Sequence, residues 1–379
     1  MRLAIDATNI SSGGGLVHLK SLLANFDLTN SVFDQVCIWG SKKTLSTLEK
    51  KDWLRLFSNK HLDGNLWSRN IWKLLYFSRA VKAERCDLLF APGGSYTGGF
   101  KSFVTMSQNM LPMEWNEMRR FGLSLMFFKL LALRFVQLKT FRKAHGLIFL
   151  TQYARDEVLK LAGNIKATST IIPHGINSYF RSTGGKSPAQ DMTVNVIYVS
   201  IIDMYKHQWN VVKAARLLRD KGINVSITFV GPASPKAYRK FCAALEQYDP
   251  AGEFCHYVGN VGHEKLPDYY AAADICLFAS TCENQPIILL EGMASGLPIV
   301  CSDKDPMPEI LKDGGIYFDA ESHESIACAL EKLINSDELK NKLASTSVGI
   351  AKNYTWSKTA QATLNFLEQV AQDNLSHST

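Results

Sequence analysis

Short runs of apolar and β-branched residues alternate with helical patterns along the whole chain. The runs are continuously apolar, which is typical of parallel strands that are covered on both faces. Strands are predicted at 3–7, 36–39, 88–91, 103–106 and 147–150 in the first half, and at 194–200, 225–230, 254–258, 275–279 and 299–302 in the second. Helices are predicted at 16–24, 208–220, 235–248 and 286–295. This alternation predicts an α/β fold with a doubly wound sheet in each half.

A polar stretch rich in Gly, Ser and Pro, residues 181–191, separates the two halves and has no periodicity. It predicts a first domain over 1–185 and a second over 186–355, followed by a C-terminal amphipathic helical segment, 356–379. In doubly wound sheets, ligands bind beyond the carboxyl ends of the strands. Functional residues are therefore expected in the loops that follow strands.

Composition places the chain among ordinary globular proteins. Hydrophobic residues make up 46% and charged residues 20%, which excludes wholesale disorder. The eight cysteines form no C-x-x-C pair and several lie in apolar runs, so we expect reduced cysteines of a cytoplasmic protein. The first apolar run, 1–6, is too short for a signal peptide, and the longest, 121–138, contains Lys129 and Arg134 and is a poor membrane span.

The most informative segment is 279–298, where a strand end leads through a polar loop into a helix. Pro286 is predicted in the first turn, and Gly296 follows the end of the helix. The start of such a helix carries free backbone N–H groups and a partial positive charge, which suit a phosphate. Glu283 lies before the helix and Glu291 lies within it. The residues alone leave open a second interpretation, in which Glu283 only complements the helix dipole and Glu291 lies on a solvated face.

The spacing Glu283-x7-Glu291, followed by 294–300, resembles the C-terminal signature of the retaining glycosyltransferases of family 4. Further segments fit that resemblance: 13–15, 172–176, 199–206, 269–274 and 307–310. The resemblance implies a GT-B fold, with two Rossmann-like domains facing a cleft, and a metal-independent hexosyltransferase without a cofactor that uses a nucleotide-sugar donor. It implies that Glu283 contacts the transferred sugar and that Glu291 holds the ribose. We expect the donor to contact Gly13, Gly14, Gly15, His174, Lys206, Asn284, Gln285, Pro286 and Ile287, and also Arg155, because of its position at the start of a helix.

The site for the donor diphosphate departs from the family pattern. Lys206 matches the family's lysine, but Ser200 and Ile201 stand where a Gly-Arg pair is usual. A preorganised donor beside the developing negative charge is typically worth ~3 kcal/mol, so a substitute for the missing cation is expected. We consider His207 and Arg155 and favour Arg155. The alternative for Lys206 is a solvated lysine without a role.

Three features of the first half carry weaker signals. Gly13 to Gly15 follow a strand, but they lack the G-x-G-x-x-G spacing, which disfavours a hydride-transfer enzyme and leaves a plain turn open. Asn109, with Gln108, stands where many relatives have a histidine; an amide cannot act as a base, but it can bind a sugar hydroxyl. The resemblance implies transfer on the donor's own face, with the leaving phosphate accepting the proton, so no side-chain base is needed. Asn109 could instead cap a helix near Glu114, and His174 could be purely structural.

The net charge of +7 has a local origin. Between Arg119 and Lys143 the chain carries seven cations and no acid, and aromatic and apolar residues stand among them. We consider two interpretations of 115–145, a long buried helix and a surface helix on anionic membrane. Nucleic acid is disfavoured because no nucleic-acid-binding module accompanies the basic residues. The sequence Asp303-Lys-Asp305 mimics the D-x-D metal motif of another glycosyltransferase fold, but we expect an ordinary loop and no bound metal.

Together these features predict transfer of a sugar, first mannose from GDP-mannose, to a lipid-linked glycan in bacterial O-antigen or capsule synthesis. The enzyme would act in the cytoplasm, with peripheral attachment to the inner face of the plasma membrane. Three alternatives stay open: a UDP-sugar-dependent transferase, a sugar-nucleotide 2-epimerase, and a non-catalytic partner subunit that binds nucleotide-sugar.

Overall fold

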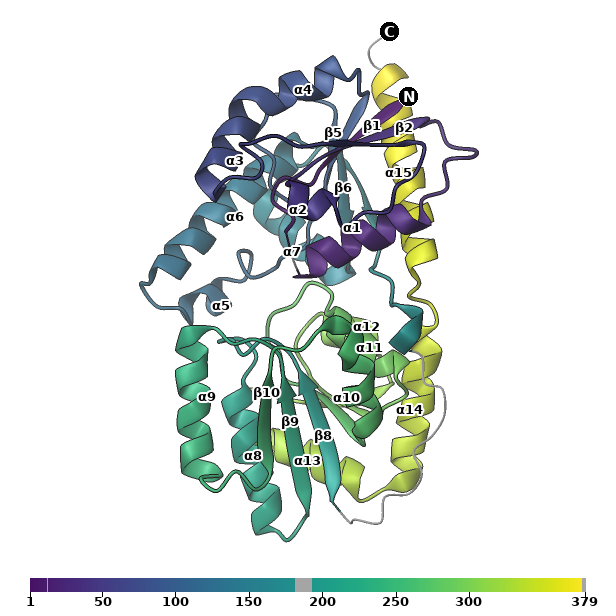
Figure 1. The fold of residues 1–379 in the computed structure, drawn as a ribbon. Coiled ribbons are helices and arrows are strands. Elements are labelled where there is room, and N and C mark those ends of the chain that lie inside the picture. Colours follow the sequence, from purple (N-terminus) through teal and green to yellow (C-terminus); the bar gives the residue numbers. More distant parts are fainter. Residues whose placement is uncertain (12, 181–192, 377–379) are drawn as a thin grey trace. The chain divides into compact units, whose positions relative to one another are not determined.

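The computed structural model describes residues 1–11, 13–180 and 193–376, which form two compact units (Figure 1). Unit 1 comprises Met1–Met113, Leu123–Gly175 and Thr355–Thr379, and unit 2 comprises Glu114–Gly122 and Ile176–Tyr354. The boundary predicted between 185 and 186 lies outside the described residues.

Unit 1 contains a seven-stranded parallel sheet in the order β3-β2-β1-β4-β5-β6-β7. Its strands are β1 (Arg2–Asp6), β2 (Gln35–Trp39), β3 (Leu54–Phe57), β4 (Leu88–Ala91), β5 (Phe103–Met106), β6 (Gly146–Phe149) and β7 (Thr168–Ile171). Its helices are α1 (Gly13–Asn25), α2 (Lys42–Leu45), α3 (Leu66–Trp72), the π-helix η1 (Lys73–Phe77), α4 (Ser78–Ala83), α6 (Leu125–Lys143), α7 (Gln152–Ala162) and α15 (Trp356–Ser376). The C-terminal helix α15 contributes Ala360, Leu364 and Leu367 to the core of this unit.

Unit 2 contains a six-stranded parallel sheet in the order β10-β9-β8-β11-β12-β13. Its strands are β8 (Val194–Val199), β9 (Val225–Val230), β10 (Cys255–Gly259), β11 (Ile275–Phe278), β12 (Ile299–Ser302) and β13 (Gly315–Phe318). Its longer helices are α8 (Gln208–Asp220), α9 (Pro235–Tyr248), α11 (Ile287–Ala294), α13 (His323–Ile334) and α14 (Asp337–Ala351). Its shorter ones are α5 (Trp115–Arg119), η2 (Ser178–Phe180), η3 (His263–Lys265), α10 (Leu266–Ala272) and α12 (Met307–Leu311). The predicted fold class, a doubly wound parallel sheet in each half, is confirmed.

Three strands were not predicted, and each lies at the edge of its sheet. They are β3, β7 and β13, and most of their residues are exposed or half-buried. An edge strand is covered on fewer sides than a central one, so it needs no continuous apolar run and leaves little signal in the sequence.

The expectation of one long helix over 115–145 is wrong. The chain forms the short helix α5, turns at Gly122, where φ is +60°, and starts α6 with the hydroxyl of Ser124 accepting a hydrogen bond from the backbone N–H of Phe127. The two pieces belong to different units, because α5 packs with unit 2: Arg120 pairs with Glu321, and Met118 is fully buried. The alternative of a buried helix is also wrong for α6, in which four of nineteen residues are buried.

Candidate functional site

The strand order of unit 2 reverses between β8 and β11, so the loops that follow these strands flank the point where doubly wound sheets bind ligands. The two strands are neighbours, with Ile275 opposite Val196. Beyond them, the backbone N–H of Thr281 donates to the carbonyl of Tyr205 at 2.9 Å. The Nε2 atom of His207 lies 3.0 Å from the hydroxyl of Thr281. These bonds join the loop 200–207 to the loop 279–286.

Lys206 and Glu283 form an ion pair between these two loops. Their side chains are 6% and 15% exposed, and the hydroxyl of Ser280 donates to the same Glu283 Oε1 atom at 2.7 Å. The Lys206 ammonium also lies 4.8 Å from the centroid of the Phe278 ring, a cation–π distance. The alternative of a solvated lysine is therefore wrong, and two residues singled out from separate motifs lie together.

Ser200 and Ile201, which stand where the family has its Gly-Arg pair, are both hydrogen-bonded to Gln208. The amide of Gln208 donates to the hydroxyl of Ser200 at 2.8 Å and to the carbonyl of Ile201 at 2.9 Å. His207 cannot supply the missing charge, because burial, with Arg120 nearby, lowers its pKa to about 4. It is neutral near pH 7, so the hypothesis that His207 replaces the cation is wrong.

Helix α11 begins at Ile287, and Pro286 is its N-cap residue rather than part of the first turn. Asn284 and Gln285, which precede it, are 5% and 7% exposed. The helix lies close against β11, because a Cβ added to Gly292 would lie 2.7 Å from Cys276 Sγ. Because α11 follows β11, which ends at Phe278, the start of the helix lies beyond the carboxyl end of that strand, as predicted.

Glu291 is buried in α11 with 1% of its surface exposed, so the interpretation as a solvated residue is wrong. Its Oε1 atom lies 2.7 Å from His263 Nε2, and Oε2 has no hydrogen-bond partner among the described residues. Burial raises the pKa of Glu291, and the hydrogen bond from His263 opposes that rise. Sequence reasoning missed His263, because only the fold brings η3 beside α11.

In unit 1, the glycine segment and the β5 loop lie together. Gly13 to Gly15 form the start of α1 rather than a loop before it, and Gly13 has a φ of +68°. A Cβ added to Gly15 would lie 3.9 Å from Gln108 Oε1. Asn109 is exposed, and its Oδ1 atom accepts from the backbone N–H of Leu111 at 3.0 Å. Asn109 does not cap α5, whose N-cap residue is Glu114.

His174 and Arg155 also belong to unit 1. His174 is 5% exposed, and its Nδ1 atom lies 3.1 Å from Nδ1 of His18, whose Nε2 atom has no partner among the described residues. Burial lowers the pKa of both imidazoles, that of His18 to about 4. Arg155 is half-buried near the start of α7, and its Nε atom is buried without a partner in the described structure.

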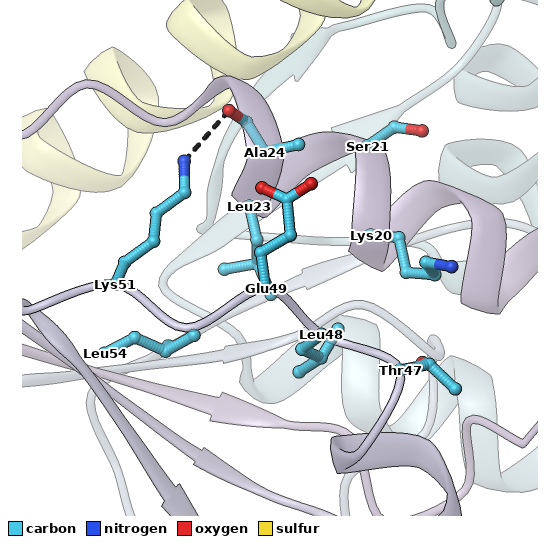
Figure 2. Close-up of a pocket in the computed structure, with 9 residues that line it drawn as sticks. All are labelled: Lys20, Ser21, Leu23, Ala24, Thr47, Leu48, Glu49, Lys51 and Leu54. Carbon is cyan, nitrogen blue, oxygen red and sulfur yellow. Dashed lines mark hydrogen bonds between the residues drawn. The ribbon is translucent and has the colours of Figure 1, made fainter.

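A surface pocket of about 210 Å³ in unit 1 lies away from these residues (Figure 2). It is lined by Lys20, Ser21, Leu23, Ala24, Thr47, Leu48, Glu49, Lys51 and Leu54. Lys51 already donates to the carbonyl of Ala24 at 3.0 Å, as Figure 2 shows. The pocket adjoins the later part of α1 and the first residue of β3, so it is not at the carboxyl edge of the sheet.

Two further observations concern metals and membranes. Asp303 to Asp305 form a loop after β12, as predicted, and the described residues contain no group of three or more His, Cys, Asp or Glu side chains that could hold a metal ion. Among the helices of the described residues, none is both long and apolar enough to cross a bilayer.

The family model described as "Glycosyl transferases group 1" matches residues 184–347, a segment that contains Lys206, Glu283 and Glu291. The likeness to glycosyltransferases predicted from the sequence is confirmed at this level, and the narrower assignment to family 4 stays a prediction.

Individual relatives are similar over part of their length. O-antigen chain mannosyltransferase B of Escherichia coli is 29% identical over 109 residues, which are 29% of each chain. A D-inositol 3-phosphate glycosyltransferase of Streptomyces griseus is 26% identical over 146 residues, which are 38% of this chain and 30% of the relative. The chain therefore spans less than a third of these curated relatives. Sucrose-phosphate synthase from Thermosynechococcus elongatus is similar over 100% of both chains, with a TM-score of 0.74 and 16% identity, which shows a shared fold.

Proposed function

We propose that this chain is a retaining glycosyltransferase of family 4 that moves a sugar from a nucleotide-sugar donor to a glycan acceptor. The observation that carries the proposal is the ion pair of buried Lys206 and half-buried Glu283 where the strand order of unit 2 reverses. These residues lie in the segment matched by the group 1 glycosyltransferase model, at the edge where a doubly wound sheet binds its ligand.

Each residue at this edge of the unit 2 sheet binds a different part of the donor. Lys206 binds the diphosphate together with the start of α11, where Asn284, Gln285, Pro286 and Ile287 precede or open the helix. Glu283 orients the sugar and Glu291 accepts hydrogen bonds from the ribose. When a donor binds, Lys206 exchanges the Glu283 carboxylate for the diphosphate, which frees Glu283 to bind the sugar hydroxyls.

The residues of unit 1 have supporting roles in this proposal. Arg155 supplies the second cation for the diphosphate, in place of the arginine that is usual in the family. Asn109 binds a sugar hydroxyl. Gly13 to Gly15 leave room beside the backbone for the donor. His174, which is buried, is a further donor-binding residue.

The transfer forms one bond and breaks one. The acceptor oxygen bonds to the anomeric carbon on the face that the leaving diphosphate vacates, and the bond from that carbon to the phosphate oxygen breaks. The acceptor's proton passes to the leaving phosphate oxygen, so no side-chain base is required. Lys206 stabilises the charge that develops on that oxygen, and neither a metal nor a cofactor takes part.

The first donor to consider is GDP-mannose, and the first acceptor is a lipid-linked oligosaccharide of O-antigen or capsule synthesis. The likeness to an O-antigen chain mannosyltransferase supports both choices. UDP-sugars are the next donors. A sugar-nucleotide 2-epimerase and a non-catalytic partner subunit are the competing functions.

Attachment to the cytoplasmic face of the plasma membrane belongs to the same proposal. In α6, Leu125, Phe128 and Phe135 are 91%, 53% and 69% exposed, and the exposed cations Lys129, Lys139, Arg142 and Lys143 share the helix. Trp67 of α3 and Leu74 of η1 are also exposed, at 78% and 57%. Both regions pack against the segment 94–96: Thr140 of α6 bonds to the backbone of Tyr96, and Lys73 of η1 donates to the carbonyl of Ser95. Apolar and basic side chains together suit a surface of anionic lipid.

The function is tested by incubating the full chain with GDP-mannose and with UDP-glucose, with and without a lipid-linked oligosaccharide acceptor. We expect acceptor-dependent release of free nucleotide and a product whose anomeric configuration matches that of the donor. A donor sugar altered at C2 without an acceptor would indicate the epimerase. Binding without any release would indicate the non-catalytic subunit.

A further inference from the structure

We propose that His263 and Tyr179 are positioning residues that hold Glu291 as an oriented carboxylate for the ribose diol of the nucleotide. The inference rests on the ribose-binding role of Glu291 in the proposed function and adds two residues to it. Neither residue belongs to the motifs that identify Glu291.

Three elements of unit 2 bring these side chains into one row of hydrogen bonds. Glu291 lies on α11, His263 opens η3 and Tyr179 lies on η2. His263 Nε2 lies 2.7 Å from Glu291 Oε1, and His263 Nδ1 lies 2.7 Å from the hydroxyl of Tyr179. Asn177 Nδ2 donates to the same hydroxyl oxygen at 2.9 Å.

The donors and acceptors in this row of hydrogen bonds fix the direction of each bond. The Asn177 amide nitrogen can only donate, so the Tyr179 oxygen accepts from it and its O–H is free to donate to His263 Nδ1. A neutral imidazole then carries its proton on Nε2, and this N–H donates a hydrogen bond to Glu291. When His263 is protonated, Nδ1 donates to the tyrosine oxygen instead, and the bond to Glu291 is kept. Glu291 Oε1 therefore receives a hydrogen bond in both states of the histidine.

A partner of this kind is needed because Glu291 is 1% exposed. A buried carboxylate without a partner is costly and takes up a proton instead. Burial raises the pKa of Glu291, and the hydrogen bond from His263 opposes that rise. In return, the bond to Glu291 raises the pKa of His263. The other titratable groups around the pair are Tyr179, Tyr270 and Cys276 near Glu291, and Glu264 near His263.

The remaining carboxylate oxygen, Oε2 of Glu291, is buried and forms no bond to another described residue. An ionised carboxylate accepts strong, charge-assisted hydrogen bonds from vicinal hydroxyls, and a protonated one loses that advantage. His263 thus favours the ionised carboxylate and leaves Oε2 unused, and a ribose diol requires both.

The experiment measures the dissociation constants of GDP and UDP by calorimetry from about pH 6.5 to pH 9. The proteins are the wild type, His263→Ala, His263→Gln and Glu291→Gln, with His256→Ala as the control because His256 is an exposed histidine of the same unit. For the tighter-binding nucleotide, we expect His263→Ala to weaken binding about tenfold at pH 6.5, relative to wild type at the same pH. The penalty should shrink as the pH rises, because a higher pH favours ionisation of Glu291 without its partner. His263→Gln, which keeps an N–H donor, should recover part of the affinity.

A structural role alone predicts a different pattern. A loss in His263→Ala that is equal at every pH, or no loss, would overturn the inference. Glu291→Gln cannot ionise, so its penalty should not follow that pH dependence.

A measurement without nucleotide separates this inference from the proposed function. In the NMR titration of His263, we expect Glu291→Gln to lower the histidine pKa, and an unchanged pKa would overturn the pair itself. An intact pair in a wild type that binds neither nucleotide would instead refute the proposed function.

Discussion

Lys206 and Glu283 are 77 residues apart in the sequence and form an ion pair between neighbouring loops of one sheet. Strand order explains this contact, because β8 and β11 are adjacent although β9 and β10 lie between them in the chain. The pair holds two charges largely out of water at the edge where doubly wound sheets bind their ligands. Its effects on stability and on activity can be separated.

Lys206→Ala should destabilise the protein by about 3–5 kcal/mol, because it leaves the Glu283 carboxylate with little solvent and no counter-charge. The double variant Lys206→Met, Glu283→Leu should recover most of that loss while nucleotide release stays abolished. Denaturant unfolding and the release assay measure the two effects. A double variant that regains activity would exclude both residues from catalysis.

Arg155→Ala should weaken donor affinity about tenfold or more, because a charge-assisted bond to phosphate contributes ~1.5–3 kcal/mol. The exposed Arg79 of α4 provides the matched control, Arg79→Ala, which should leave affinity unchanged. Calorimetry with GDP and UDP gives the affinities. Equal affinity and turnover in Arg155→Ala and wild type would rule out Arg155 as the replacement for the missing cation.

The buried pair of His18 and His174 should make stability fall in mild acid. Burial lowers the pKa of His18 to about 4 and that of His174 well below 6.5. Below pH 6.5 the unfolded chain therefore binds protons that the folded chain does not, and stability decreases as the pH falls toward 4. For His18 the loss between pH 6.5 and pH 5 is about 1–2 kcal/mol. The free energy of unfolding should depend less steeply on pH in His18→Asn, and an unchanged slope would contradict the assignment.

Gly292→Ala should destabilise unit 2 by about 1–3 kcal/mol, because the added Cβ would lie 2.7 Å from Cys276 Sγ. Cys276→Ala removes that sulfur, so the double variant should be more stable than the sum of the two single effects predicts. Unfolding free energies of the four proteins form the cycle. If the free-energy changes of the two single variants add up to that of the double variant, the contact does not limit how closely α11 approaches β11.

The wild type should float with vesicles that contain anionic lipid, and salt should weaken the binding. Phe128→Ser with Phe135→Ser should reduce binding about tenfold or more, because two exposed aromatic side chains of α6 no longer enter the lipid. Val258→Ser, at an exposed apolar residue of unit 2, is the control. Salt-insensitive binding, or equal binding by all three proteins, would contradict a docking role for α6.

Much of the fold follows from the sequence alone. The continuous apolar runs predicted the central strands within one or two residues, since a strand covered on both faces must be apolar along its length. The loops that carry the candidate site residues were also predictable, because a loop after a parallel strand reaches the carboxyl edge of the sheet whatever the strand order.

The tertiary structure decided which of these residues meet and in what state. Only the strand order brings Lys206 to Glu283, and only the packing of η3 on α11 brings His263 to Glu291. Burial makes His207 neutral. Residues 114–122 belong to unit 2, whereas the helix that follows them, α6, belongs to unit 1. Pairing, burial and protonation depend on atoms far away in the sequence. A local sequence pattern indicates which face of a helix or strand is apolar, but it does not indicate which residues pack against that face.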